Sequence, residues 1–502
     1  MHHYKRRGDA TAKCVELKKI HISKQQTWRR NRRLRILLIL AVAAAYYAMK
    51  VRVFSSVAVL PVENHISAKL FLSNDKITQP ESLISDAAAT ITTLSSESTN
   101  QKTKTVAYAV SITSCSDTRK KPATPATNPH LIDSAAVLKH SIHLAHQSSQ
   151  YEYTTHAFVY QDDNGNPKEN ACSRTLEQLG YKVQLVSTPI KVEEIRNSDL
   201  RKHVQNSGCC GEKEFLKLYS LTLTQYSIVV HLDLDSMLLK PIDDYLDLLT
   251  KRNPMDALYT RDYGMAHKDD KLSRIGVQGG FWMVRPNLDV FRELCDIVLD
   301  GADFEEGYGW GGRGLGKSWY YGAAQIQGLL SYYYSSVHPS SSSSAAVEVN
   351  RCYINTMSDE PNRDICSNET IATVNSISDH REAAKLNATH QPYHYCQDCS
   401  QTPLSEIYSA HFTKCQKPYH CRSLESILCL KLHYRWHEIR DNLEDHWRKI
   451  SNSTTKAHKK TARKHYSMDE VTRYRDVLTT FRWHCRGTNQ YKPLEIPEDL
   501  HG

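Results

Sequence analysis

The stretch Ser227-Ile228-Val229-Val230-His231-Leu232-Asp233-Leu234-Asp235 joins an apolar run directly to two carboxylates. Such a run indicates a strand that is buried in a sheet. In an extended strand, residues two apart face the same side, so Asp233 and Asp235 can present their carboxylates to one cation. Oxygen ligands of this kind suit Mg²⁺ or Mn²⁺ bridging a diphosphate. The stretch therefore predicts a metal site at the carboxyl end of a buried strand.

Apolar runs and helical patterns alternate along the chain from residue 106 onward. The expected strands are 106–112, 156–160, 181–186, 227–232, 257–260 and 281–284. The expected helices are 133–146, which Asp133 could cap, a short one near Leu176, 213–225 and 288–299. This βαβα order favours a mostly parallel sheet with helices on both faces, and a ligand at the carboxyl ends of its strands.

The net charge of +9, from 64 Lys and Arg against 55 Asp and Glu, is concentrated at the amino terminus. Residues 1–35 hold 12 Lys or Arg against Asp9 and Glu16, which is +10 and leaves −1 for residues 36–502. A neutral body lacks the clustered cations that nucleic-acid binding needs. We therefore expect no nucleic-acid partner.

An uncharged apolar run, residues 36–49, follows the basic tail and can be extended to residue 60 if Lys50 and Arg52 reach toward the membrane surface. The positive-inside rule then predicts a cytosolic tail (1–35), a transmembrane signal anchor (36–60) and a lumenal remainder. A cleaved signal peptide is the alternative, but a basic region of 35 residues is long for one. Residues 61–104 are rich in Ser and Thr and predict a flexible stem. We expect a single-pass type II protein of the Golgi (or ER) membrane.

Thirteen cysteines follow the predicted anchor, and those in the last third of the chain lie at short spacings. Glycosylation sequons at Asn368, Asn387 and Asn452 indicate a secretory compartment, where disulfides are the default. A zinc site is the alternative, because Cys396 and Cys399 have zinc-ligand spacing and Cys415, His420 or Cys421 could complete the site. The carboxyl-terminal extension, residues 422–502, is predicted to be disulfide-rich and helical over 424–450 and 468–483.

The stretch from Phe215 through Asp243 resembles the central block of glycosyltransferase family 8, the glycogenin-like enzymes. Other blocks agree in content and order, namely 106–110 with 135–141, 278–286, and 411–419. The resemblance covers residues 105–421, within which residues 336–400 or so are interpreted as a surface insertion.

The resemblance implies a GT-A fold, an α/β architecture with a single mixed, mostly parallel sheet flanked by helices. It also implies a UDP-sugar donor, a Mn²⁺ (or Mg²⁺) ion, and transfer of a hexose or related sugar, with retention of configuration, to a glycan or glycoprotein acceptor. The metal ligands that it implies are Asp233, Asp235 and His411. The donor-binding residues are Asp233 together with Lys217, Gln278, Gly279, Gly280 and Lys417.

Three positions depart from the family pattern. Gln278 replaces an Asn, Lys414 replaces a Gly, and Ala324 replaces the acid of a Gly-Asp-Gln motif. Without that acid we predict same-face attack, in which Gln325 orients the donor and Lys417 carries the developing diphosphate charge. Asp262 is the nearest substitute for a covalent nucleophile. The alternative function is a non-catalytic, membrane-tethered protein that binds nucleotide sugars or carbohydrate.

Residues 311–318 match the P-loop pattern, and residues 307–312 match a dinucleotide-binding pattern. Both patterns require a hydrophobic strand directly before the glycines. The preceding segment, 303–308, is polar. We therefore interpret the stretch as a loop near the acceptor side.

Overall fold

The structure is a computed structural model that describes most of the chain from residue 105 onward. The described residues are 105–114, 129–161, 171–207, 210–250, 255–263, 275–312, 322–339, 346–363, 366–376, 393–422, 424, 426–450, 484–497 and 500. The chain divides into two units, residues 1–96 and 97–502, and the described residues all belong to the second. The predicted tail, anchor and stem lie outside the described ranges. Within those ranges, no helix is long and apolar enough to cross a bilayer.

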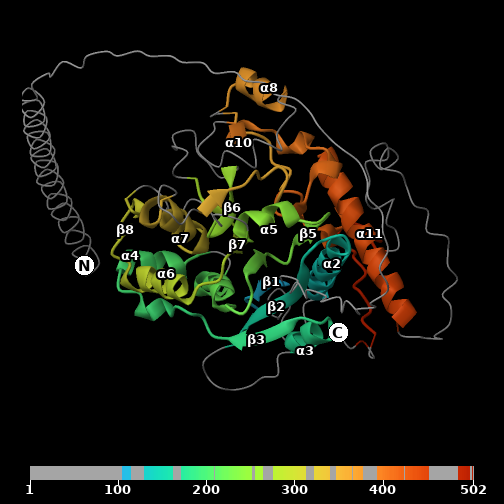
Figure 1. The fold of residues 1–502 in the computed structure, drawn as a ribbon, viewed down its shortest axis with the longest axis horizontal. Coiled ribbons are helices and arrows are strands. Elements are labelled where there is room, and N and C mark those ends of the chain that lie inside the picture. The colour runs from blue at the N-terminus through green and yellow to red at the C-terminus, as the bar shows by residue number, and fades with distance from the viewer. Residues whose placement is uncertain are drawn as a thin grey trace, which may run out of the picture. The chain divides into compact units, whose positions relative to one another are not determined.

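A seven-stranded sheet forms the centre of the fold (Figure 1). From edge to edge its strands are β10 (Ala346–Glu348), β6 (Ala257–Arg261), β7 (Val277–Val284), β4 (Ile228–Leu232), β1 (Thr105–Ile112), β2 (Glu152–Tyr160) and β3 (Lys182–Val186). Strand β7 runs antiparallel to β4 and β6, and the remaining pairings are parallel. The prediction of a mixed, mostly parallel sheet is confirmed, and the arrangement fits the fold that the resemblance implies.

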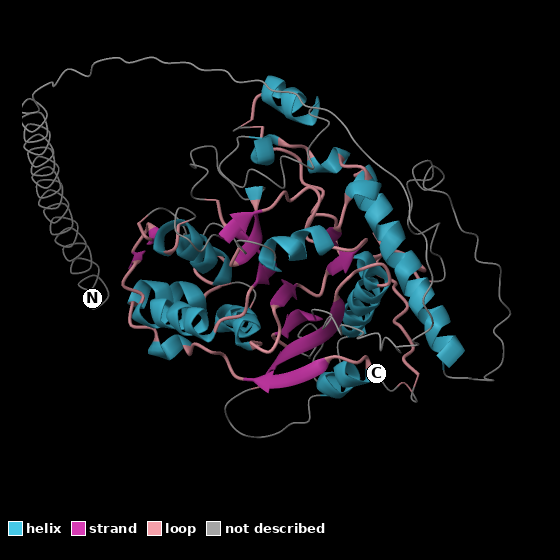
Figure 2. Ribbon diagram, viewed as in Figure 1, coloured by secondary structure: helices cyan, strands magenta, loops and turns pink. Residues whose placement is uncertain are grey.

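Helices cover both faces of the sheet (Figure 2). Alternate residues of β1 enter two separate apolar clusters, with Val106 and Tyr108 in one and Ala107 and Ala109 in the other. The first cluster includes residues of α2 (Pro129–His146), α3 (Ala171–Gln178), α5 (Asp243–Thr250) and α11 (Ile427–Ile450). The second includes residues of α4 (Ser198–Gln205), the 3₁₀ helix η2 (Gly211–Thr222), α6 (Leu288–Asp300) and α7 (Ile326–Tyr332). Because both faces of β1 are buried in these clusters, the side chains at its centre are apolar or aromatic.

Short elements complete the described part. Two small strand pairs lie apart from the central sheet, β5 (Ser236–Leu238) with β11 (Ser409–His411) and β8 (Phe304–Glu305) with β9 (Gly309–Trp310). The remaining helices are α8 (Asn368–Ser376), α10 (Tyr393–Cys396), the π-helical turn η5 (Tyr333–Val337), and the 3₁₀ turns η1 (Val192–Glu194), η6 (Cys399–Gln401), η7 (Leu404–Glu406) and η8 (Pro418–His420). The glycines at 311 and 312 follow the antiparallel pair β8 and β9, not a strand of the central sheet.

The expectation that Asp133 caps a helix is wrong. Helix α2 begins at Pro129, a residue well suited to a first helical turn, and Asp133 lies inside the helix with only 1% of its surface exposed. Its carboxylate accepts hydrogen bonds from the Tyr491 hydroxyl (2.6 Å) and the Leu494 backbone N–H (2.9 Å). Asp133 therefore connects α2 to the carboxyl-terminal segment, which also packs on α11.

The carboxyl-terminal extension contains the predicted helix, now bounded as α11, which lies beside α2 (Figure 1). The second predicted helix, 468–483, lies outside the described ranges, as do the sequons at Asn387 and Asn452. Part of the segment 336–400 lies in the core, since β10 forms an edge of the sheet and Asn350, Arg351 and Cys352 are buried.

Disulfides join the cysteines that the zinc alternative would use. The pairs are Cys352–Cys399, Cys366–Cys396, Cys415–Cys429 and Cys421–Cys485. Cys172 and Cys210 are also disulfide-bonded, and among the described cysteines the free thiol is the buried Cys295. The prediction of disulfides is confirmed, and the cysteines of the zinc alternative, Cys396, Cys399, Cys415 and Cys421, are not available to zinc.

Candidate active site

The two carboxylates of the opening stretch flank a turn instead of sharing one side of a strand. Strand β4 ends at Leu232, and the backbone N–H of Ser236 donates to the carbonyl of Asp233 at 3.0 Å. The expected extended geometry is therefore wrong, but the two carboxylates still lie close together. The turn between β4 and β5 brings the carboxylates of Asp233 and Asp235 to the same histidine.

His411 reaches this turn because β11 pairs antiparallel with β5, with His411 opposite Ser236. Two backbone hydrogen bonds fix the crossing. The N–H of Phe412 donates to the carbonyl of Asp235 (2.8 Å), and the N–H of His411 donates to the carbonyl of Thr356 (2.9 Å). The side chain of His411 is consequently buried beside two carboxylates that lie about 180 residues earlier in the chain.

The side chains of Asp233, Asp235 and His411 offer three ligand atoms that lie within 4.8 Å of one another. The His411 Nε2 atom is 3.8 Å from Asp233 Oδ2 and 3.5 Å from Asp235 Oδ1. Among the described residues, no hydrogen-bond partner faces the buried Nδ1 atom of His411. Two carboxylates and a histidine fit Mn²⁺, which accepts oxygen and imidazole ligands.

Gly280 provides the space for this arrangement. A Cβ atom at position 280 would lie 2.4 Å from His411 Cε1 and 2.8 Å from Asp233 Oδ2, which is closer than real side chains approach. The carbonyl of Gly280 also accepts from the N–H of Asp233 at 3.0 Å. Strand β7 therefore passes so close to the site that only glycine fits at this position.

Lys217 is a positioning residue for Asp233. Its ammonium lies 2.9 Å from Asp233 Oδ1, 3.2 Å from Glu214 Oε2 and 3.0 Å from the carbonyl of Gly279. An ammonium has three donors, so these three acceptors account for all of them. Burial opposes ionisation of Asp233, but Lys217 and then His411 outweigh it and lower the pKa of Asp233 to about 2. Asp233 is consequently a carboxylate at neutral pH.

Lys417 directly precedes η8, and its ammonium contacts Asp235 Oδ2. Burial lowers the pKa of Lys417 to about 8, and the charge of Asp233 partly offsets this effect. The side chain of Lys417 is 29% exposed, whereas that of Lys217 is only 9% exposed.

Gln278 points its amide into the protein. Its Oε1 atom accepts from the N–H of Gly280 (2.6 Å) and from Asn355 Nδ2 (3.2 Å), and only 4% of the residue is exposed. Asn355 Nδ2 also donates to Thr260 Oγ1 at 3.0 Å. Gln278 therefore fixes the backbone of the two glycines relative to the segment that follows β10.

Gln325 is held by the segment that leads into η2. Its Oε1 atom accepts from Ser207 Oγ (2.8 Å), and its Nε2 atom donates to the carbonyl of Gly211 (2.5 Å). Only 1% of Gln325 and 6% of Ala324 are exposed. Both ends of this amide are thus engaged in joining α7 to η2, the helix that carries Lys217.

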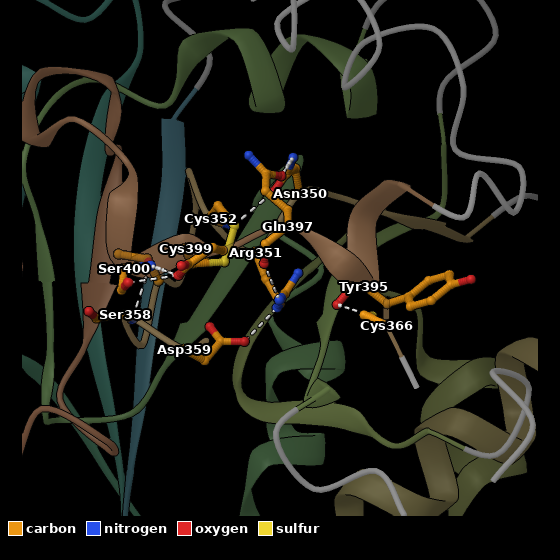
Figure 3. Close-up of a disulfide and its surroundings, with 12 residues drawn as sticks. Asn350, Arg351, Cys352, Ser358, Asp359, Cys366, Tyr395, Gln397, Cys399 and Ser400 are labelled. Atoms are coloured by element: carbon orange, nitrogen blue, oxygen red, sulfur yellow. Dashed lines mark hydrogen bonds and ion pairs between the residues drawn. A yellow bond between two sulfur atoms is a disulfide. The ribbon is translucent and has the colours of Figure 1, made fainter. Parts of the chain in front are cut away.

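Asp262 follows β6 and is partly exposed. Burial, and then the negative charge of Asp359, raise the pKa of Asp262 to about 6, against the opposing influence of His411. Asp359 itself is fully buried and accepts from Arg351 Nε at 2.6 Å, beside the Cys352–Cys399 disulfide (Figure 3). The Arg351–Asp359 ion pair therefore lies close enough to Asp262 for both of its charges to act on that carboxyl group, in opposite directions.

Several residues around the site were not anticipated, among them Glu214, Asn355 and Asp359. Glu214 lies three residues before Lys217 in a helical pattern, a spacing that places side chains on one face and could have indicated the pair. Asn355 and Asp359 reach the site through β10 and the segment after it. Since they lie far from the carboxylate turn in sequence, no local spacing relates them to it.

Comparison with known proteins returned only distant structural likenesses. No family model and no curated protein sequence matches the chain. The galactosyltransferase LgtC, solved with donor and acceptor sugar analogues, aligns with a TM-score of 0.32 and 12% identity over 69% of this chain and 99% of that one. Mouse xyloside xylosyltransferase 1 aligns with a TM-score of 0.33 and 10% identity over 61% and 97%. GlyE of Streptococcus pneumoniae aligns with a TM-score of 0.34 and 12% identity over 69% and 64%. Alignments this distant assign neither an activity nor a ligand to this chain.

Proposed function

We propose that this chain is a Mn²⁺-dependent retaining glycosyltransferase, which moves a hexose or related sugar from a UDP-sugar to a glycan or protein acceptor. The observation that carries the proposal is the meeting of Asp233, Asp235 and His411 at the carboxyl end of β4, above a glycine that leaves room for them. In open α/β sheets this end is where ligands bind. A divalent cation held by these three residues would supply positive charge to the donor diphosphate.

The residues around the cluster have separable roles in this proposal. Lys217, which also pairs with Glu214, holds the Asp233 carboxylate in place, and Gln278 holds the two glycines. Lys417, which is partly exposed, is positioned to contact the departing diphosphate and to stabilise its developing charge. Lys217 acts through Asp233, because its donors are engaged within the protein.

For the chemical step we propose same-face attack. The acceptor oxygen bonds to the anomeric carbon as the bond from that carbon to the diphosphate oxygen breaks, and the acceptor's proton passes to the departing phosphate oxygen. Ala324 supplies no carboxylate, and the amide of Gln325 is engaged with Ser207 and Gly211. The covalent alternative would use Asp262. A sugar attached to Asp262, detected by mass spectrometry after incubation with donor and no acceptor, would overturn same-face attack.

The non-catalytic function is the second candidate. It is favoured by Ala324 and by the engaged amide of Gln325, which together leave the family's Gly-Asp-Gln position without a free polar group. Both candidates predict metal-dependent UDP binding, so binding tests the site and turnover separates the functions.

We also propose that the protein works in the secretory pathway, held in the Golgi or ER membrane by residues 36–60. The basic tail beside an apolar run supports this location, as do the disulfides, which persist in oxidising compartments.

The site is tested by UDP binding to the purified full chain with Mn²⁺ and with EDTA. We expect EDTA, Asp235→Asn and His411→Ala each to abolish measurable binding. Asp256→Asn is the matched control. Asp256 lies at the amino end of β6, opposite to the carboxyl end where the site lies, and pairs with Arg285 at 3.6 Å. UDP affinity that is the same with Mn²⁺ and with EDTA would contradict the metal assignment.

A further inference from the structure

A second group of metal-ligating side chains lies where the carboxyl-terminal segment packs on α11. Asp441 and Glu444 are on the helix, and His484 precedes Cys485 of a disulfide. The His484 Nε2 atom is 3.0 Å from Asp441 Oδ1 and 3.9 Å from Glu444 Oε1. One ligand atom from each residue lies within 4.8 Å of the others, and the group shares no residue with the candidate active site.

The separations are close to those within a metal's ligand shell. Nitrogen and oxygen ligands lie about 2.0–2.2 Å from a zinc ion, so neighbouring ligand atoms in a tetrahedral site are about 3.3–3.5 Å apart. The His484–Asp441 separation is near this value, and Glu444 has to move by less than about 1 Å to reach it. Asp441 and Glu444 are three residues apart, which places both side chains on one helix face.

The neighbours of these side chains hold them in orientations that suit a ligand role. His437 Nδ1 lies 3.0 Å from His484 Nδ1, and both residues are buried. At this distance His437 Nδ1 can accept a hydrogen bond from the Nδ1–H of His484. His484 Nε2 then carries its lone pair toward the carboxylates. Arg440 Nη2 orients Glu444 Oε1 from 3.1 Å, a supporting arrangement common around metal ligands.

Nitrogen-bearing side chains also contact the two carboxylates of the group. Arg440 lies between Glu444, at 3.1 Å, and Asp133, at 3.9 Å, and Asp441 contacts the imidazole of His484.

We infer that Asp441, Glu444 and His484 bind a divalent transition-metal ion, with Zn²⁺ preferred over Mn²⁺, at a structural site separate from the candidate active site. Imidazole and carboxylate ligands suit both ions, and the general order of affinities places Zn²⁺ above Mn²⁺. The ion ties the segment 484–497 to α11. Through Asp133, which bonds Tyr491 and Leu494 of that segment, it also stabilises the packing against α2.

The test measures Zn²⁺ binding to the full chain after chelator treatment, by metal analysis and by competition with a chromophoric chelator. Asp233→Asn is introduced first to weaken the active site. We expect this variant to retain one tight equivalent of Zn²⁺ and to melt about 3 °C higher when free Zn²⁺ is 100 times the Kd. Adding Glu444→Gln should weaken binding at least about 10-fold and remove the shift, since even indirect ligand contacts are worth that much.

Two further variants make the outcome decisive. Glu438→Gln is the control, since Glu438 lies on α11, pairs with Arg435 at 2.9 Å and is not one of the three ligand residues, and it should bind Zn²⁺ normally. Asp441→Asn keeps the side-chain shape and should behave as Glu444→Gln does. Zn²⁺ affinity unchanged by both cluster variants, or no tight Zn²⁺ in the Asp233→Asn chain, would show that Asp441, His484 and His437 form a metal-free hydrogen-bonded chain. Neither result depends on whether the chain transfers sugar.

Discussion

Adding one methyl group at Gly280 should disrupt the candidate metal site without altering any of its polar groups. In Gly280→Ala the new Cβ atom would meet His411 Cε1 at 2.4 Å, whereas nonbonded carbon atoms settle at about 3.5–4.0 Å. The same methyl would lie 2.8 Å from Asp233 Oδ2. Only 3% of His411 is exposed, so the imidazole or β7 has to move by roughly 1 Å to relieve the contact.

A displacement of this size exceeds what a metal site tolerates. Ligand distances are held to about 0.2 Å, so a shift of about 1 Å removes His411 from the ligand set. We expect the Mn²⁺-dependent affinity for UDP to fall at least about 100-fold, which corresponds to about 2.8 kcal/mol. Overpacking should also lower the free energy of unfolding by about 1–3 kcal/mol.

Gly279→Ala is the matched control, one residue away on the same strand. Its methyl would meet Gln327 Cγ at 3.0 Å and Ile326 Cγ2 at 3.3 Å, which are side-chain atoms that can shift. Calorimetric titration of UDP with Mn²⁺, together with urea unfolding, separates lost binding from lost stability. The reasoning fails if Gly280→Ala binds UDP within about 3-fold of the unmodified chain, or if both variants lose affinity equally.

Three other expectations follow from buried charges and exposed sequons. In Lys217→Met, Glu214 and Asp233 lose their shared counter-charge. Without divalent cations, we expect urea titration to show a free energy of unfolding that is lower by about 3–5 kcal/mol, and a decrease below about 1 kcal/mol would refute the positioning role. Burial lowers the pKa of His433 to about 4, from about 6.5 in the unfolded chain. The contribution of the neutral imidazole to the free energy of unfolding is therefore fully present above about pH 6.5 and is lost as the pH falls toward 4. Between pH 7 and 4 the unmodified chain should therefore lose up to about 3 kcal/mol more than His433→Gln, and parallel pH profiles would rule this out. Asn368 begins α8 and is exposed, so after expression in secretory cells Asn368→Gln should lose one glycan by mass spectrometry, unless the chain never enters the lumen.

The sheet could be predicted because its central strands are long apolar runs. Buried strands such as β1 and β4 tolerate few polar residues on either face, so composition alone marks them. Edge strand β10 has three residues and follows a serine run, and nothing in its composition distinguishes it from a loop. Asp is common at helix starts, which is why the sequence predicts a cap at Asp133. Its position inside α2 could not be predicted, because its partners Tyr491 and Leu494 lie more than 350 residues away.

The metal cluster could be predicted only in part. Asp233 and Asp235 are marked by their position after an apolar run, but the turn that joins them to β5 leaves no period in the sequence. Only the family resemblance identifies His411 as a candidate ligand. No local pattern does so, because the position of His411 depends on the pairing of β11 with β5 across more than 170 residues. The amide of Gln325 is hydrogen-bonded to Ser207 and Gly211, and no local sequence pattern predicts these contacts.

UDP release from a panel of UDP-sugars, measured on the purified full chain with Mn²⁺ and a mixture of glycan and glycoprotein acceptors, tests the proposed activity most directly. We predict that at least one donor releases UDP and that EDTA and Asp235→Asn each abolish this release, while Asp256→Asn leaves it unchanged. Mn²⁺-dependent UDP binding with no release from any donor would contradict the transferase and leave the non-catalytic function. Release that persists in Asp235→Asn would contradict the site.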